Sequence, residues 1–418
     1  MPDFETVIGL EVHVELATKS KVFCGCPTTF GAAPNTQVCP VCLGLPGVLP
    51  VLNRRALEHA VTVGLALECA IAPRFKFDRK HYYYPDLPKN FQISQYDVPL
   101  ALGGSLALPG GRTVRIKRVH LEEDAGKLIH EGAGGQIGGG AAALVDYNRS
   151  GLPLLEIVSE PDLREPAEAV TYLKAIQTLV RYLRVSDGNM EEGSLRCDAN
   201  VSVRPRGAAE LGAKVEIKNM NSFRAVERAL THEAARQREA LGRDETIAQE
   251  TRLYDEAAGG TRPMRGKEEA HDYRYFPEPD LPVFTADEEF VAPLRKALPE
   301  LPAARQARFA SEYGLPAYDV EVLTADRATA DWFEEAVGAG APPKAAGNWV
   351  MTELLGKLNA AGHGLAERRD ARATGARRVG HLRSAARRIG GGLPYAVDAR
   401  QQRPQPLAIP RVARIAPP

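Results

Sequence analysis

The sequence predicts an α+β fold that is followed by a separate helical domain. In the first 290 residues or so, segments with the two-residue period of strands and the 3.6-residue period of helices occur in blocks, rather than in strict βαβ alternation. From about residue 290 to about residue 364, only helical periodicity remains. The chain has 418 residues, which is the length of two or three domains.

The first part of the chain shows both periods clearly. From Leu10 to Leu16, apolar residues alternate strictly with Glu11, His13 and Glu15, which predicts a strand with one polar face. The same reasoning predicts strands at 112–124, 154–158, 197–203 and 213–217, and helices at 53–68, 166–183 and 223–241. Clusters of Pro, Gly, Cys or aromatic residues predict irregular structure at 24–50, 73–100 and 131–143.

The sequence pattern of the second part of the chain changes twice. Four short helices are predicted at 298–313, 317–323, 328–337 and 344–358. After about Gly364, lysine disappears, arginine becomes frequent and the end of the chain is rich in proline. No fold is predicted for this tail, because it has little apolar periodicity.

Composition and charge exclude several classes of protein. Apolar residues make up 44% and charged residues 25% of the chain, which is ordinary for a soluble globular protein. The formal net charge is +0, so the overall charge does not indicate DNA or a membrane as a partner. No stretch approaches the roughly 20 apolar residues of a membrane-spanning helix, and Met1–Leu10 lacks the pattern of a signal peptide. We therefore expect a cytoplasmic protein.

Four of the six cysteines form a compact pattern. Cys24-Gly-Cys26 and Cys39-Pro-Val-Cys42 make a CxC…CxxC set, and two such pairs supply four thiolates for a tetrahedral Zn²⁺ ion. The alternative is four unrelated core cysteines. A site with four protein ligands is closed to substrate, so this zinc would be structural. The other two cysteines stand alone and are predicted to be small core residues.

Polar side chains along the first strand raise the possibility of a cation site. Glu11, His13 and Glu15 project from one face, and carboxylates on a sheet face bind hard cations such as Mg²⁺. On spacing alone, a solvated sheet face is the simpler interpretation of this alternation. Lys80 lies in a basic, tyrosine-rich segment that fits either a phosphate clamp or a surface loop. The sequence has no P-loop, dinucleotide-binding or nucleophile-elbow motif, so a nucleotide site would be of an uncommon kind.

Eight long strings of residues together closely resemble one enzyme family. The strings are Val7–Leu16, Lys76–Asp86, Gln92–Gln95, His120–Lys127, Asp146–Asp162, Met190–Asn200, Glu216–Phe223 and Tyr275–Pro282. They resemble the B subunits of the tRNA-dependent amidotransferase, and the resemblance covers about residues 3–360. It does not extend into the Arg- and Pro-rich residues 365–418, which look like a shifted reading frame or a truncation and are expected to be disordered.

The resemblance implies a fold, a reaction and partners. The fold is a cradle-shaped, mixed-sheet catalytic domain over 1–290, followed by a helical domain over 291–364. The reaction is a glutamine-dependent carbon–nitrogen ligation. ATP activates the Glu or Asp carried on misacylated Glu-tRNA(Gln) or Asp-tRNA(Asn), and ammonia converts it to the amide for translation. An A subunit, an amidase, releases the ammonia from glutamine, and a small C subunit completes a heterotrimer.

The resemblance also implies roles for individual residues. Magnesium is expected at Glu11, His13 and Glu123, and zinc at the four clustered cysteines in a knuckle near 24–42. The further catalytic candidates are Lys80, which also matches a position near the ATP phosphate or the ammonia exit, Glu192 and Asp198.

Two other interpretations are open. A zinc-containing RNA-binding protein without catalysis would have no need for the magnesium residues. An archaeal-type relative specific for Glu-tRNA(Gln) would carry a large inserted domain, and the segment between about 290 and 360 is too short for one.

Overall fold

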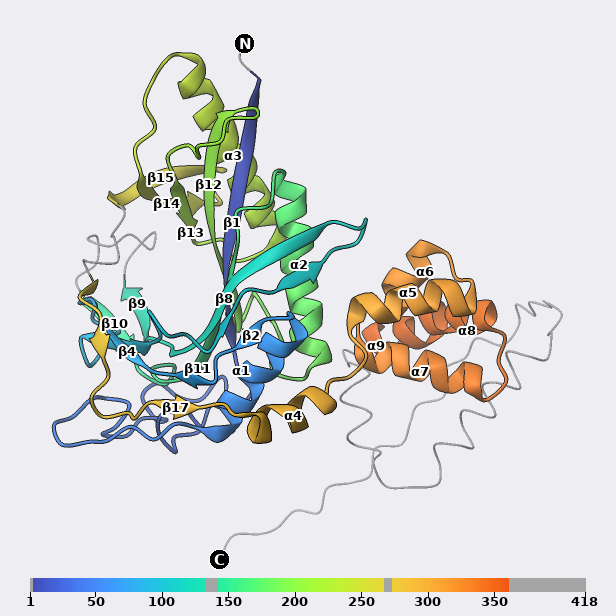
Figure 1. The fold of residues 1–418 in the computed structure, drawn as a ribbon, viewed down its shortest axis with the longest axis horizontal. Coiled ribbons are helices and arrows are strands. Elements are labelled where there is room, and N and C mark those ends of the chain that lie inside the picture. Colours follow the sequence, from blue (N-terminus) through green and yellow to red (C-terminus); the bar gives the residue numbers. More distant parts are fainter. Residues whose placement is uncertain (1–2, 132–141, 267–272, 361–418) are drawn as a thin grey trace, which may run out of the picture. The chain divides into compact units, whose positions relative to one another are not determined.

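A computed structural model of the chain describes residues 3–131, 142–266 and 273–360 (Figure 1). The chain divides into two compact units, Met1–Arg327 and Ala328–Pro418, and each is described by itself. Most of the glycine-rich stretch predicted as a loop at 131–143, and all of the tail at 365–418, lie outside the described residues. The domain boundary near residue 290, which rests on composition and resemblance, stays a prediction.

Within the described residues, the first unit contains a ten-stranded mixed sheet. Its order is β15-β14-β13-β12-β1-β11-β8-β6-β2, with β7 also paired to β8. The strands are β1 (Phe4–Glu15), β2 (Ala70–Ile71), β6 (Ala101–Leu102), β7 (Ser105–Ala107), β8 (Thr113–Glu123), β11 (Pro153–Ser159), β12 (Leu195–Pro205), β13 (Val215–Lys218), β14 (Glu250–Asp255) and β15 (Gly260–Gly266). Only β13 and β14 pair in parallel, so the sheet is mixed and the predicted α+β class is confirmed.

Within the described residues, three small sheets accompany the large one, and the first two of them join segments that are distant in the sequence. They are β16 (Phe276–Pro277) with β4 (Asp78–His81) and β5 (Phe91–Ser94), β17 (Phe284–Thr285) with β3 (Arg74–Phe75), and β9 (Lys127–Glu131) with β10 (Ala142–Asp146). The sequence did not predict the strands between 73 and 100, because each is only two to four residues long and shows no period. Residues 24–50 have no regular helix or strand, as predicted, apart from a single bridge between Ser20 and Pro27.

Several helices of the first unit begin at capping side chains. Its described helices are α1 (Arg54–Ala66), α2 (Pro166–Tyr182), α3 (Phe223–Gly242), α4 (Glu288–Lys296), α5 (Pro302–Tyr313) and α6 (Ala317–Thr324). The Asn53 side chain accepts hydrogen bonds from the first turn of α1, and Ser222 caps α3 in the same way. Pro302 at the first position explains why α5 begins later than predicted. The sequence did not predict α4, which is short and contains Pro293.

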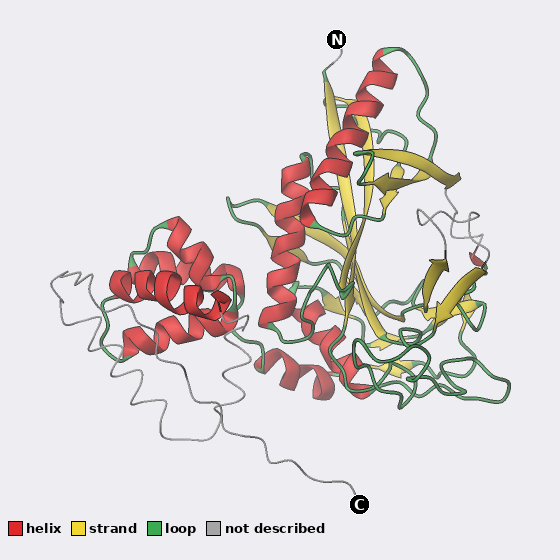
Figure 2. Ribbon diagram, turned by 180° about the vertical axis from the view of Figure 1, so that it is seen from behind, coloured by secondary structure: helices red, strands yellow, loops and turns green. Residues whose placement is uncertain are grey.

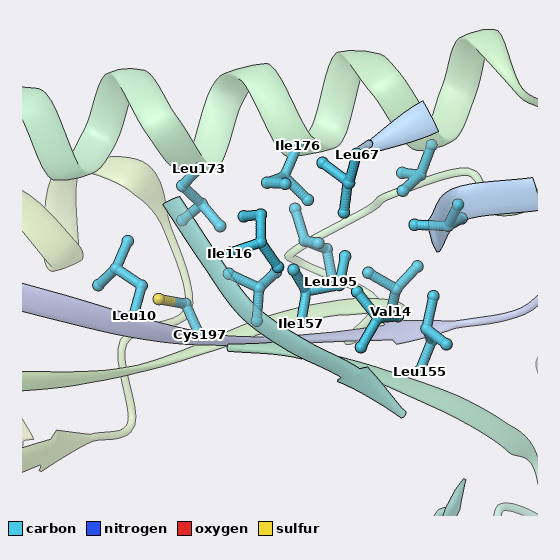
Figure 3. Packing of buried hydrophobic residues seen from close by; sticks show 14 of the residues in the cluster. Leu10, Val14, Leu67, Ile116, Leu155, Ile157, Leu173, Ile176, Leu195 and Cys197 are labelled. Carbon is cyan, nitrogen blue, oxygen red and sulfur yellow. The ribbon is translucent and has the colours of Figure 1, made fainter. Parts of the chain in front are cut away.

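One face of the large sheet forms the core. Leu10 and Val14 of β1 are buried against Leu173 and Ile176 of α2 (Figure 3). Each fully buried side chain of this size contributes about 1.5–3 kcal/mol to folding. Helices α2 and α3 lie along this side, whereas β4, β9 and β10 lie on the other side (Figure 1, Figure 2). The polar side chains of these alternating strands therefore point to the face of the large sheet that lies away from the core.

The second unit contains a small group of helices. Its described elements are α7 (Arg327–Gly338), which starts at the boundary, α8 (Pro343–Trp349), the π-helical turn η2 (Val350–Leu354) and α9 (Leu355–Ala360). The rings of Trp332 and Trp349 stack with their centroids 5.2 Å apart. No helix in the described part of either unit is both long and apolar enough to cross a bilayer.

Candidate active site and zinc site

The polar face of the large sheet brings together charged residues from neighbouring strands. His13 on β1 pairs with Glu156 on β11, and Glu156 pairs with His120 on β8. Side chains that are paired in this way lie about 4.5–5.5 Å apart at Cβ, so the three form one row across the sheet. Glu122 lies two residues beyond His120, on the same side of β8.

Three of these residues form a candidate metal site. His13, Glu122 and Glu156 each offer one ligand atom, and these atoms lie within 4.8 Å of one another. The His13 Nε2 lies 3.4 Å from Glu156 Oε2, while His120 Nε2 lies 3.5 Å from the same oxygen and 3.6 Å from Glu122 Oε2. The Ser94 hydroxyl donates to Glu122 at 2.9 Å, which orients that carboxylate. Two carboxylates with an imidazole suit a divalent cation, and Mg²⁺ is commonly held by one or two carboxylates.

The charged side chains of this group shift one another's pKa values. Burial alone would lower the pKa of His13, but the hydrogen bond to Glu156 and the charges of Glu156, Asp198 and Glu122 raise it to about 9. Burial alone would raise the pKa of Glu156, but the charges of the two histidines hold it well below its usual value. The neighbouring positive charges therefore keep the buried carboxylates on this face ionised.

Lys80 approaches the same group from the small sheet. It lies on β4, is half-buried, and its Nζ is 4.8 Å from the centroid of the Tyr273 ring. Burial disfavours its charge, but Glu122 and Glu156 more than compensate and raise its pKa. Lys80 is therefore close enough to Glu122 and Glu156 to interact with their charges, although it lies on a different sheet.

The structure brings Glu11 near this group but not into it. Glu11 lies two residues before His13 on the same face and pairs with Asp198 of β12. Its carboxylate accepts a hydrogen bond from Asn200 at 2.8 Å. Asp198 in turn forms an ion pair with Lys218 at the end of β13.

Glu123 points elsewhere. Its carboxylate forms an ion pair with Lys89 and accepts a hydrogen bond from the backbone N–H of Ile93 at 2.9 Å. It lines a cavity of about 250 Å³ that also reaches Cys24 and Cys42. Successive side chains of a strand point to opposite faces, so β8 presents Glu122 on the polar face and turns Glu123 away from it. The carboxylates that accompany His13 are therefore Glu122 and Glu156.

The sequence contained a signal for Glu156. It interrupts the otherwise apolar strand β11, and its neighbours Leu155 and Ile157 are fully buried. A carboxylate within such a strand needs a charged partner, which indicates a functional group. Glu192, by contrast, lies exposed in the turn before β12, and its backbone N–H bonds to the Asn189 side chain at 3.4 Å.

Glu15 belongs to a second charged cluster on the polar face. Burial and the charge of Asp124 raise the pKa of Glu15 to about 8. Arg196 lies 2.7 Å and Arg149 3.5 Å from the same Asp124 carboxylate. Arginines therefore supply the counter-charge in this second cluster, whereas histidines supply it in the group of His13 and Glu156.

The four clustered cysteines come together as predicted. The Sγ atoms of Cys24, Cys26, Cys39 and Cys42 all lie within 4.8 Å of one another. The Cys39 N–H donates to Cys42 Sγ at 3.2 Å, and the buried Lys21 ammonium lies 3.7 Å from that sulfur. Hydrogen bonding from Cys24 and from the Cys39 backbone, together with the Lys21 charge, lowers the pKa of Cys42 to about 4. Four thiols in one cluster, with one of them held as a thiolate, fit a tetrahedral zinc site.

Comparisons with known proteins identify the family of the chain. The family described as the GatB/GatE catalytic domain matches residues 6–292. A protein of Thermodesulfovibrio yellowstonii, named as the B subunit of an aspartyl/glutamyl-tRNA(Asn/Gln) amidotransferase, is 57% identical over 367 residues, which is 87% of this chain and 76% of the relative. Proteins of the same name from Geobacter sulfurreducens and Myxococcus xanthus are each 55% identical, over 87% and 86% of this chain and 76% and 74% of their own lengths. The chain belongs to the family of amidotransferase B subunits, and it is therefore one component of an enzyme.

Proposed function

We propose that this chain activates and amidates the side-chain carboxylate of Glu or Asp on misacylated Glu-tRNA(Gln) or Asp-tRNA(Asn). The products are Gln-tRNA(Gln) and Asn-tRNA(Asn), which enter translation. The observation that supports this proposal is the group His13, Glu122 and Glu156 facing Lys80, on the polar side of a sheet whose other side is core. A protein that only binds RNA has no use for carboxylates that are buried and held ionised in this way.

The reaction has two steps. An oxygen of the carboxylate attacks the γ-phosphorus of ATP, a new P–O bond forms, the bond from phosphorus to the bridging oxygen breaks, and ADP leaves. Ammonia then attacks the acyl carbon, a C–N bond forms, phosphate leaves with the electrons of the C–O bond, and the nitrogen loses a proton. Phosphoryl transfer depends on positioning and charge neutralisation more than on a covalent catalyst, which suits a site of fixed charges.

The residues of the polar face divide these tasks. Glu122 and Glu156 would hold Mg²⁺, joined by His13 once the ion displaces the proton of its imidazole, with Glu11 beside them on the same face. Bound Mg²⁺ would neutralise charge on the phosphate oxygens. Lys80 would bind a phosphate as a point charge from the opposite sheet. Among the other predicted residues, Glu123 would contribute through its ion pair with Lys89. Glu192 would lie near the site, on the turn before β12.

The cysteine cluster and the partners complete the proposal. Zn²⁺ held by the four cysteines would cross-link the irregular segment 24–42, which has little regular structure of its own. Relatives of this chain are named as B subunits of an amidotransferase, so ammonia would come from glutamine through a separate amidase subunit. A small third subunit would join the amidase to this chain.

Formation of an activated intermediate tests the proposal. The full chain, assembled with an amidase and a small subunit, is incubated with Glu-tRNA(Gln), γ-labelled ATP and Mg²⁺, but without glutamine or ammonia. The expected result is transfer of label to the tRNA-bound Glu, followed by Gln-tRNA(Gln) after ammonium chloride is added. ATP consumption that does not depend on misacylated tRNA, with no labelled aminoacyl group, would refute it.

A further inference from the structure

A fully buried lysine lies beside the cysteine cluster. Lys21 has 0% of its surface exposed and is among the largest completely buried side chains of the described residues. Its ammonium lies 3.7 Å from Cys42 Sγ and donates a hydrogen bond to the Tyr147 carbonyl oxygen at 3.3 Å. No carboxylate in the described part of the chain forms an ion pair with Lys21. A buried ammonium needs a counter-charge, and here the contact is with a cysteine sulfur.

The backbone of Lys21 is fixed to the same cluster. Its N–H donates to the Cys26 carbonyl oxygen at 3.0 Å, and its own carbonyl oxygen accepts a hydrogen bond from the Asn53 side chain at 3.2 Å. Gly151 packs against the stem of the side chain, since a Cβ atom added there would lie 3.5 Å from Lys21 Cδ and 3.4 Å from Cys42 Cβ. The cysteine segment, the cap of α1 and the segment before β11 therefore hold the ammonium in place.

The cluster needs positive charge beside it once a metal is bound. Four thiolates carry two more negative charges than one Zn²⁺ ion neutralises. Away from water this excess charge disfavours the loaded site, unless N–H groups or cations contact the sulfurs. The Cys39 N–H donates to Cys42 Sγ at 3.2 Å, and Lys21 brings a full positive charge to the same sulfur.

We propose that Lys21 is a positioning residue of the zinc site, whose ammonium neutralises part of the excess negative charge of the four thiolates and so tightens zinc binding. This inference rests on the zinc assignment within the proposed function. The same ammonium donates to Tyr147, so it also joins the cluster to the segment that leads into β11. The charge of Lys21, in addition to its packing, therefore contributes to the affinity for zinc.

The competing explanation is that Lys21 only fills space and donates to Tyr147. In that case, removing the ammonium destabilises the zinc-free and the zinc-loaded chain alike. Under the proposal the loss appears mainly in the loaded chain, because all four cysteines are thiolates only when the metal has displaced their protons.

The test measures the zinc affinity of the full chain by competition with a chromogenic chelator of known affinity. For Lys21→Met we expect the dissociation constant for Zn²⁺ to rise about 10–10²-fold, the scale for loss of a group that supports a metal ligand. Lys21→Gln, which keeps an N–H donor but has no charge, should weaken zinc binding in the same direction. The matched control is Lys19→Met, because Lys19 is exposed two residues before Lys21 and should leave the affinity unchanged.

A second pair of variants tests the charge itself. Cys26→His replaces one thiolate by a neutral imidazole, so the loaded cluster keeps four ligands but has one negative charge fewer. Adding Lys21→Met to Cys26→His should therefore reduce the zinc affinity much less than adding it to the unmodified chain. A purely structural Lys21 predicts an equal reduction in both backgrounds.

The remaining outcomes also decide between the explanations. If Lys21→Met binds zinc as tightly as the unmodified chain, or if its loss is equally large beside Cys26→His, the inference is wrong and the zinc assignment stands. If Lys21→Met does not fold, Lys21→Gln and its combination with Cys26→His give the same comparison. If the unmodified chain binds no zinc, the zinc assignment fails and the inference fails with it.

Discussion

His13 on β1 and Glu156 on β11 are direct partners across the sheet, with His13 Nε2 3.4 Å from Glu156 Oε2. The same Glu156 oxygen lies 3.5 Å from His120 Nε2, so a single carboxylate sits between two imidazoles. A charge within a buried strand is tolerated only when it is paired, and here the pairing comes from both neighbouring strands. The same pairing orients the ligands of the proposed metal site.

Removing a member of this group should strongly reduce amidation. We expect His13→Ala and Glu122→Gln each to reduce ATP- and tRNA-dependent amidation by about 10²–10⁴-fold, the scale for loss of electrostatic stabilisation in a transition state. The rate of Gln-tRNA(Gln) formation with ammonium chloride measures this. Glu256→Gln, in the exposed turn between β14 and β15, is the control. Near-normal rates in both site variants would show that the metal site lies elsewhere. Glu11 and Asp198 would then be the next candidate ligands to test.

The cysteine cluster should carry about one Zn²⁺ per chain. Cys39→Ser should lower the zinc content and the thermal stability, because three thiolates hold the metal less tightly than four. Metal analysis of protein purified without chelators gives the stoichiometry. Cys69→Ser serves as the control, since Cys69 is buried outside the cluster. Absence of zinc in freshly prepared protein would remove the zinc assignment.

Glu233 on α3 should contribute a pH-dependent part of the stability. It is fully buried, accepts a hydrogen bond from Thr261 at 2.8 Å and forms ion pairs with Arg236 and Arg252. Burial alone would raise the pKa of Glu233, but the hydrogen bonds from Arg236, Gln237 and Thr261 lower it below its ordinary value of 4.5. Its contribution is therefore fully present above pH 4.5 and is lost as the pH falls through the folded pKa.

Urea unfolding of Glu233→Gln should show this dependence. At pH 7 we expect a loss of about 1–3 kcal/mol, because the buried Arg252 loses one of its two carboxylate partners and keeps only Glu250. The difference from the unmodified chain should narrow as the pH is lowered below 4.5. Glu239→Gln on the same helix is exposed and should stay within about 0.5 kcal/mol. A difference that stays constant down to pH 3 would show that the Glu233 charge does not contribute.

The chain alone should not hydrolyse glutamine. Its described cysteines are either in the cluster or buried at Cys69 and Cys197, where burial raises both thiol pKa values and disfavours a nucleophilic thiolate. Glutamine-dependent amidation should appear only when an amidase subunit is added, while free ammonia should replace glutamine. Release of glutamate from glutamine by the isolated chain, measured with an enzyme-coupled assay, would contradict this division of labour.

Local patterns in the sequence were enough to predict the long helices and strands, and to identify the four cysteines of the candidate zinc site. Strict alternation from Leu10 to Leu16 is enough to specify β1 and its polar face, because the side-chain period of a strand is independent of its neighbours. The CxC…CxxC spacing likewise identified four cysteines that the fold brings within one metal's reach. Resemblance to a family then identified the reaction class.

Only the tertiary structure decided which carboxylates accompany His13. Glu122 and Glu123 are adjacent in sequence, and the choice between them depends on which face of β8 meets β11 and on the register of that pairing. The pairing of Phe276 with Arg79, and the ion pair of Arg79 with Glu278, join residues that are far apart along the chain. No local period records such contacts, because they form only when non-local strands align and bury their other face in a common core.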